Sequence, residues 1–279
     1  MSSLIHQGRA SYAFFERNWN LTKRYWAWEI VWLVYNIVNA LAVTFIGAAA
    51  QDLPGTKGLK IDTAPLILFL VIGTAVWSYL SVTFEGVTDL ITIERWEGTI
   101  EHTFMAPISR FTHLIGSCWY AVAHGMLFTF IQLFVVGAFF HLDLSHANYL
   151  TAVFMLLAGS VSFIGFGIAA SALPLLFTER GSQMSYIVRA VLLLVSGVYY
   201  PVSVLPGWMQ PLARISPATY VLQGLRAGLL ENKAVWSPEI WSNTWPLIIT
   251  GIVSIPLGVF IFRIAERYAK RSGKLKRNG

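Results

Sequence analysis

The sequence predicts an all-α, polytopic membrane protein with six transmembrane helices, an N-terminal interfacial helix, a short cytoplasmic helix and re-entrant helices after the fifth span. Hydrophobic residues make up 56% of the 279 residues and charged residues only 12%, whereas soluble domains carry about 25% charged residues. The mean hydropathy is +0.59. The charged residues also concentrate between long apolar segments, as expected if those segments cross a bilayer.

The first 27 residues predict an amphipathic helix that lies in the membrane interface. Their aromatic residues fall on one helical face, away from the polar side chains of Arg17, Asn20 and Arg24. A helix packed against protein fits the same pattern and remains an alternative. No cleavable signal peptide is expected, because the first 25 residues lack an apolar core and a small-residue cleavage site. The aromatic face consists of Tyr12, Phe15, Trp19 and Trp26.

The transmembrane domain is expected to cover residues 28–262, followed by a basic cytoplasmic tail at 263–279. Each apolar segment in this range is bounded by polar, Gly or Pro residues and approaches the length that crosses about 30 Å of hydrocarbon. The only cysteine, Cys118, falls within one of them, where we expect a buried thiol. We place the spans at 28–50, 65–83, 114–140, 149–176, 185–204 and 245–262.

The distribution of Lys and Arg predicts that both termini are cytoplasmic. The side of the membrane that holds the N-terminus also holds Arg95, Arg110, Arg180 and the basic tail. The opposite side carries far fewer basic residues. The net charge of +6 therefore reflects membrane topology and gives no reason to expect nucleic acid as a partner. The residues expected outside are Lys57, Lys60, Arg214, Arg226 and Lys233.

An acidic segment, ERWEGTIEHTFMAPISR at 94–110, separates the second and third spans. A single helix at about 93–107, ended by Pro107, would place Glu94, Glu97 and Glu101 within an arc of about 60°. An adjoining arc would hold apolar side chains that can lie on the membrane surface, leaving the carboxylates for a partner in the water. A solvated loop is the alternative. The apolar arc consists of Ile93, Trp96, Ile100 and Phe104.

A second informative segment, at 196–230, is apolar but rich in Pro and Gly. Because proline cannot sit within a continuous helix without breaking it, we expect helices interrupted by breaks, partly at membrane depth. The re-entrant part is placed at about 201–230. The prolines are Pro201, Pro206, Pro211 and Pro217.

These two segments resemble those of type-2 ATP-binding-cassette exporter permeases, in the daunorubicin-resistance-like group. The acidic segment resembles the cytoplasmic coupling helix of that family, and SGVYYP with LPGW and SPATY resembles its outer re-entrant helices. The resemblance implies that an ATPase subunit docks on Glu94, Glu97, Gly98, Thr99, Glu101 and Arg110, beside Pro107 and Ser109. It also implies a substrate path or outer gate at Tyr199, Tyr200, Pro201, Trp208 and Tyr220, shaped by Pro206, Pro217 and Arg226.

The chain contains no P-loop sequence, so the resemblance implies that ATP and Mg²⁺ bind a separate ABC ATP-binding subunit and that this chain is not itself an enzyme. The expected assembly also holds a second permease copy, more readily a homodimer than a heterodimer, and contacts membrane lipid. The implied activity is export of a drug, lipid or lipid-linked glycan across the cell (inner) membrane. No cofactor is expected in this chain.

Two other functions remain as alternatives. An ion-coupled secondary transporter or channel needs charged groups near the middle of the membrane, whereas the acids here gather at the cytoplasmic surface. A membrane enzyme would depend on His141, Asp143 and His146, for which we expect no metal because a fourth ligand is lacking nearby. Arg189, inside the fifth span, is expected to reach the interface or to pair with an acid such as Glu179; a role in substrate entry is a further possibility.

Overall fold

The computed structural model describes residues 2–52, 63–106, 108–142, 146–177 and 180–272, and all regular structure in these ranges is helical. Within these ranges, five stretches are long and apolar enough to cross a membrane: Trp26–Ala48, Ala64–Thr88, Thr112–Phe139, Tyr149–Leu176 and Pro238–Arg271. The longer helices are α1 (Ser2–Arg24), α2 (Trp26–Ala48), α3 (Ala64–Thr88), α6 (Arg110–Phe139), α7 (Tyr149–Ala170), α9 (Gly181–Val195), α11 (Pro217–Leu230) and α12 (Pro238–Arg271). The shorter ones are η1 (Ala49–Asp52), α4 (Leu90–Trp96), α5 (Ile100–Met105), α8 (Ala172–Leu176), η2 (Val202–Val204) and α10 (Gln210–Ile215).

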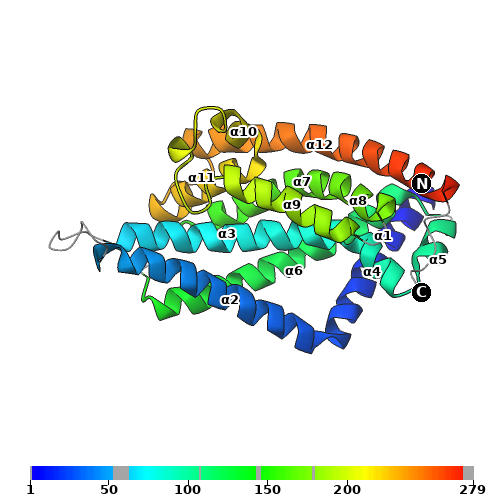
Figure 1. Cartoon of the computed structure of the whole chain (residues 1–279), viewed down its shortest axis with the longest axis horizontal. Helices are drawn as coiled ribbons and strands as arrows, with labels where there is room; N and C mark the ends of the chain where they lie inside the picture. Colours follow the sequence, from blue (N-terminus) through cyan, green and yellow to red (C-terminus); the bar gives the residue numbers. More distant parts are fainter. Residues whose placement is uncertain (1, 53–62, 107, 143–145, 178–179, 273–279) are drawn as a thin grey trace.

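The long helices lie side by side as a bundle, with different short elements at its two ends. Figure 1 shows α1, α4, α5, α8 and the last turns of α12 at one end, and α10 toward the other. We call the first the α4–α5 end. The connections alternate between the ends, so segments far apart in sequence meet at each of them.

Helix α3 forms the centre of the bundle and contacts α2, α6, α7 and α11. Its side chains Tyr79, Leu80 and Phe84 are fully buried. The Tyr79 hydroxyl is hydrogen-bonded to the hydroxyl of Ser160 on α7, which satisfies a polar group inside an apolar core. Helix α3 is therefore the central helix against which these helices pack.

Helices α7 and α12 approach each other closely because glycines line their contact. A Cβ atom on Gly258 would lie 2.6 Å from the carbonyl oxygen of Gly165, too close for any larger residue without movement. A Cβ on Gly251 would meet a methyl of Val161 at 2.8 Å. Small residues allow such close backbone packing in membrane helices, where van der Waals contact drives association.

A second apolar cluster supports the α4–α5 end. Because α4 and α5 bury apolar side chains in this cluster, their positions are fixed relative to the long spans. The thiol of Cys118 is buried here, as the sequence predicted. The cluster includes Leu90, Ile91, Ile100, Leu114, Cys118, Leu175, Phe262 and Ala265.

Predicted boundaries differ from the structure at the fifth span, the sixth span and the basic tail. The sixth span was expected to start at 245, but α12 begins at Pro238. The fifth span was expected to reach residue 204, but α9 ends at Val195 and, with 15 residues, is shorter than the five candidate spans. Gly197 follows with a φ of 71°, which ends the helix. Conversely, the basic tail expected from Arg263 is helical as far as Arg271, because Ala265 and Ala269 pack in the second cluster.

Candidate functional site

The acidic segment forms two short helices joined by a turn, rather than the single helix expected at 93–107. The break falls at Gly98, whose φ of 72° cannot continue a right-handed helix. The amide of Thr99 donates to the carbonyl oxygen of Glu94 at 2.9 Å, which closes the turn. Helix α5 then starts in a new direction, so the 100° periodicity across Glu94, Glu97 and Glu101 is lost. Pro107, expected to stop the helix, lies outside the described residues.

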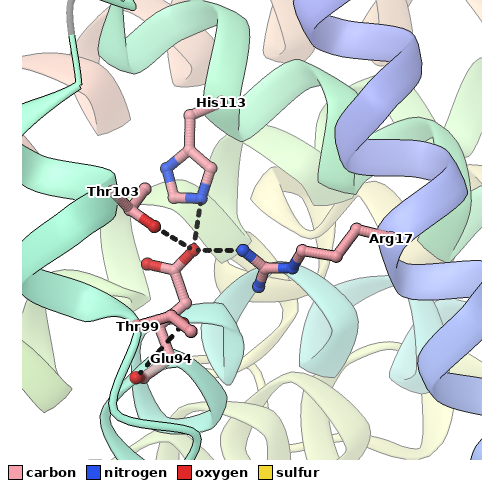
Figure 2. Close-up of polar contacts among 5 residues, drawn as sticks. All are labelled: Arg17, Glu94, Thr99, Thr103 and His113. Carbon is pink, nitrogen blue, oxygen red and sulfur yellow. Dashed lines mark hydrogen bonds and ion pairs between the residues drawn. The ribbon is translucent and has the colours of Figure 1, made fainter.

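Glu94 lies inside the protein, contrary to the expectation that it shares an exposed strip with the other two glutamates. None of its side chain is exposed. Its Oε1 atom accepts from Arg17 Nη1 of α1 at 3.1 Å and from the hydroxyl of Thr103 on α5 at 3.3 Å. The same oxygen lies 2.9 Å from Nε2 of His113 on α6. We call Arg17, Glu94, Thr103 and His113 the Glu94 node; Figure 2 shows these side chains converging on one oxygen.

The Glu94 node joins four segments of the chain through one buried carboxylate. Removing a charge from water is costly, and the partners must compensate for that cost. The second oxygen, Glu94 Oε2, and Nδ1 of His113 are buried and have no hydrogen-bond partner among the described residues. The hydrogen bonds and ion pair of the Glu94 side chain thus all involve Oε1. A substitution of any partner should therefore alter how all four segments pack together.

Helix α1 is fixed to the start of α6 by further contacts around the node. The ring of Phe14 lies against that of His113 with centroids 4.6 Å apart. The hydroxyl of Ser11 donates to the carbonyl oxygen of Thr112 at 3.2 Å. Gly116 permits this approach, because a Cβ there would lie 2.5 Å from the carbonyl oxygen of Ser11. Helix α1 therefore packs on protein along its Ser11 and Phe14 side, while Tyr12 of the predicted aromatic face is 67% exposed.

The surface outside the node carries both charge and apolar side chains. Glu101 and His102 are exposed, and Glu97 is half-buried at the turn. Met105, at the end of α5, is 83% exposed, and Trp96 is exposed beside Tyr25. Methionine is enriched at protein interfaces, whose rims are polar. We call Glu97, Glu101, His102 and Met105 the α4–α5 surface.

The other residues predicted for docking have mainly structural positions. Gly98 and Thr99 form the turn, and Arg110 is the first residue of α6 after the capping residue Ser109. Met105, Arg17 and His113 were not among the site residues predicted from the sequence. The Ser109 cap at least indicates where α6 starts, but nothing local shows that His113 or Arg17 faces Glu94.

At the opposite end, Arg226 of α11 holds the turn that follows α9. Its guanidinium donates to the carbonyl oxygens of Gly197 at 3.2 Å and Val198 at 2.9 Å. Its central carbon also lies 3.4 Å from the ring centroid of Phe69 on α3. Beside it is a cavity of about 490 Å³ bounded by Pro201, Gln223, Arg226 and Glu239. Arg226 and Pro201 thus border one cavity.

The remaining residues predicted for the path or gate do not border this cavity. Tyr199 is half-buried against the apolar core that α3, α7, α11 and α12 form together. The hydroxyl groups of Tyr200 and Tyr220 donate to the carbonyl oxygens of Leu194 and Arg214, which closes turns of the outer segment. Trp208 is 73% exposed.

A histidine pair considered as a metal site has no third ligand within the described part of the chain. His141 adopts a left-handed backbone conformation with a φ of 51°, and His146 is exposed. Asp143 lies outside the described residues. No group of three or more His, Cys, Asp or Glu residues suited to a metal occurs among those described.

Residues 10–230 match the sequence model of the family described as "ABC-2 type transporter". The chain is 25% identical over 223 residues to the protein described as "Inner membrane transport permease YadH" of Escherichia coli K12, covering 76% of this chain and 84% of that protein. The proteins of that description from Escherichia coli O157:H7 and Shigella flexneri match to the same extent.

Proposed function

The chain belongs to the ABC-2 type transporter family, and from this premise we propose that it is the permease of an ATP-driven exporter. As a family member, it is a membrane subunit of an ABC transporter. A separate ATP-binding subunit, holding ATP and Mg²⁺, supplies the energy. The cargo is an amphipathic drug, lipid or lipid-linked glycan that moves outward. The observation that carries the proposal is the α4–α5 surface, connected to the transmembrane helices through the Glu94 node.

The α4–α5 surface has the features that docking on an ATPase requires. Met105 can enter an apolar pocket, while Glu97 and Glu101 face basic residues at its rim. Charges at such a rim mainly set specificity and the rate of association. Because Leu90, Ile91 and Ile100 anchor both short helices in the second apolar cluster, the surface is held in place before a partner binds.

The Glu94 node gives this surface a connection to the spans. When the ATPase subunits close on ATP, force applied to α5 passes through Thr103 and Glu94 to Arg17 on α1 and His113 on α6. Nucleotide can drive transport only if it binds one conformation of the assembly more tightly than the other. In this proposal, the node lets α1 and α6 move together with the docking surface.

The proposed assembly contains two permease copies, as a homodimer, and two ATPase subunits in the inner membrane. The relatives from Escherichia coli and Shigella flexneri are described as inner membrane transport permeases, which supports this location. Both termini are assigned to the cytoplasm because most Lys and Arg residues then lie inside.

The first test is affinity purification of the full chain from its native membranes in a mild detergent, with mass spectrometry of the proteins that remain bound. We expect a stoichiometric partner that contains a P-loop. Recovery of the intact chain without such a partner, under conditions that retain other ABC complexes, would contradict the proposal and favour an ion-coupled transporter or channel.

The docking surface is tested by charge reversal. The variant Glu97→Arg/Glu101→Arg should lose most of the bound ATPase, because the two introduced arginines would repel the basic rim. The control is Glu231→Arg, which reverses an exposed carboxylate at the opposite end of the bundle. We expect the control to retain the partner. Equal recovery from both variants would show that the ATPase docks elsewhere.

A further inference from the structure

An ion pair connects α9 and α3 near the α4–α5 end of the bundle. Nη1 of Arg189 pairs with Oε1 of Glu85. Arg189 lies eight residues after the start of α9, or about 12 Å along the helix. Glu85 lies within the last turn of α3. Glu179, the partner considered from sequence, is outside the described residues.

Both members of this pair remain accessible. The side chain of Arg189 is 30% exposed and that of Glu85 is 34% exposed. Both charged groups can therefore be reached from outside the bundle, so a ligand can contact them without separating α3 from α9.

An aromatic ring lies beside the pair. The guanidinium of Arg189 lies 5.1 Å from the ring centroid of Tyr186, one turn earlier on α9. Aromatic faces attract cations, and tyrosine combines an apolar ring with a polar hydroxyl.

Charge balance decides which kind of ligand can replace the pair. An anion on Arg189 alone would leave Glu85 without its partner, and a cation on Glu85 alone would leave Arg189 unpaired. Leaving one partner of such a pair uncompensated is strongly unfavourable. A headgroup that carries both charges exchanges one ion pair for two and leaves neither residue unpaired. Arginine also binds phosphate well, because its planar fork can donate two hydrogen bonds.

We propose that Arg189 and Glu85 bind the zwitterionic headgroup of a phospholipid-like amphiphile, with the phosphate on Arg189 and the ammonium between Glu85 and the Tyr186 ring. The internal ion pair closes the site when no ligand is bound. This inference rests on the proposed export function, because it specifies the headgroup of the cargo, but its binding step can be measured on the permease alone.

The test uses probes that share one alkyl chain and differ in headgroup charge. The full chain is purified in dodecyl maltoside, and its thermal unfolding is followed while dodecylphosphocholine, dodecyl phosphate or dodecyltrimethylammonium is added at low mole fraction. We expect saturable stabilisation by dodecylphosphocholine and at least about tenfold weaker binding of the two singly charged probes, since each lacks one charge-assisted contact.

Variants separate ligand binding from a structural role. Arg189→Gln and Glu85→Gln should each weaken the binding of dodecylphosphocholine by about tenfold or more, whatever they do to the unfolding temperature itself. The matched control is His124→Gln, which breaks the 3.0 Å contact between His124 of α6 and Glu29 of α2. The control should bind the probe like the wild type. Unchanged binding in Arg189→Gln and Glu85→Gln would refute the proposal.

A second measurement distinguishes cargo from a resident bilayer lipid. In the complex with its ATPase, reconstituted in vesicles of anionic lipid, a zwitterionic phospholipid should accelerate ATP hydrolysis in the wild type and much less in Arg189→Gln. Binding without any acceleration would overturn the assignment as cargo. A chain that retains its ATPase but does not bind dodecylphosphocholine would refute this inference and leave the export function intact.

Discussion

Glu94 illustrates how far the properties of a single residue depend on distant parts of the chain. Helical periodicity placed it with Glu97 and Glu101, because those positions repeat at nearly whole turns. The structure instead surrounds it with Arg17, which is 77 residues away in sequence, and His113, which is 19 residues away. Local pattern could identify an acidic segment, but the burial of one carboxylate results from the packing of α1 on α6.

The Glu94 node can be tested by removing its charge. Glu94→Gln keeps the size of the side chain but leaves Arg17 and His113 without a carboxylate partner. Because Arg17 is partly exposed to solvent, we expect a loss of about 1–3 kcal/mol in stability, below the range for a fully buried pair. The loss is measured as a lower unfolding temperature of the purified chain in detergent.

Glu97→Gln is the control for this prediction, because it removes the same charge from a half-buried position outside the node. Its unfolding temperature should remain close to that of the wild type. In the complex, Glu94→Gln should also lower transport more than it lowers partner binding, since the α4–α5 surface is retained. Identical unfolding temperatures for the two variants would argue against a stabilising node.

At the level of helices, the sequence predicted breaks best where proline and glycine occur together. The segment at 196–230 was expected to alternate helices and breaks, and α9, α10 and α11 are separated by non-helical residues. Gly98 alone was not taken as a break, because a single glycine is often tolerated inside a helix. Its positive φ is required by the turn that lets Ile100 reach the second apolar cluster.

The turn at Gly98 predicts an order of stability for substitutions. Gly98→Ala should cost about 1–2 kcal/mol, because the left-handed conformation is unfavourable for a residue with a Cβ atom. Gly98→Asn should cost less, since asparagine tolerates this conformation better. Gly137→Ala is the control: a Cβ there meets no atom within 4 Å, and alanine favours a helix. Thermal unfolding in detergent should rank Gly137→Ala highest and Gly98→Ala lowest; a neutral Gly98→Ala would contradict the required turn.

For the molecule as a whole, the membrane makes the arrangement of spans easier to predict than their contacts. A spanning helix must be apolar over its length, and this constraint is visible within a short stretch of sequence. The five candidate spans therefore agree with predicted ones. Contacts such as that between Gly165 and Gly258 depend on the relative rotation of two helices, which the sequence pattern does not determine. The pairing of Arg189 with Glu85 was missed for the same reason.

The proposed topology can be measured because the chain has one cysteine and that cysteine is buried. In a Cys118→Ala background, single cysteines are introduced at exposed positions by Glu101→Cys, Ser272→Cys, Trp208→Cys and Glu231→Cys. With the α4–α5 end in the cytoplasm, a membrane-impermeant maleimide should label positions 101 and 272 in inside-out vesicles, and positions 208 and 231 in right-side-out vesicles. Positions 101 and 272 are separated along the chain from positions 208 and 231 by apolar helices. These helices are long enough to cross the membrane, so the two pairs of positions should lie on opposite sides of it. Labelling of 101 and 231 from the same side would exclude this topology, and labelling of 101 only from outside would place the α4–α5 surface beyond the reach of a cytoplasmic ATPase.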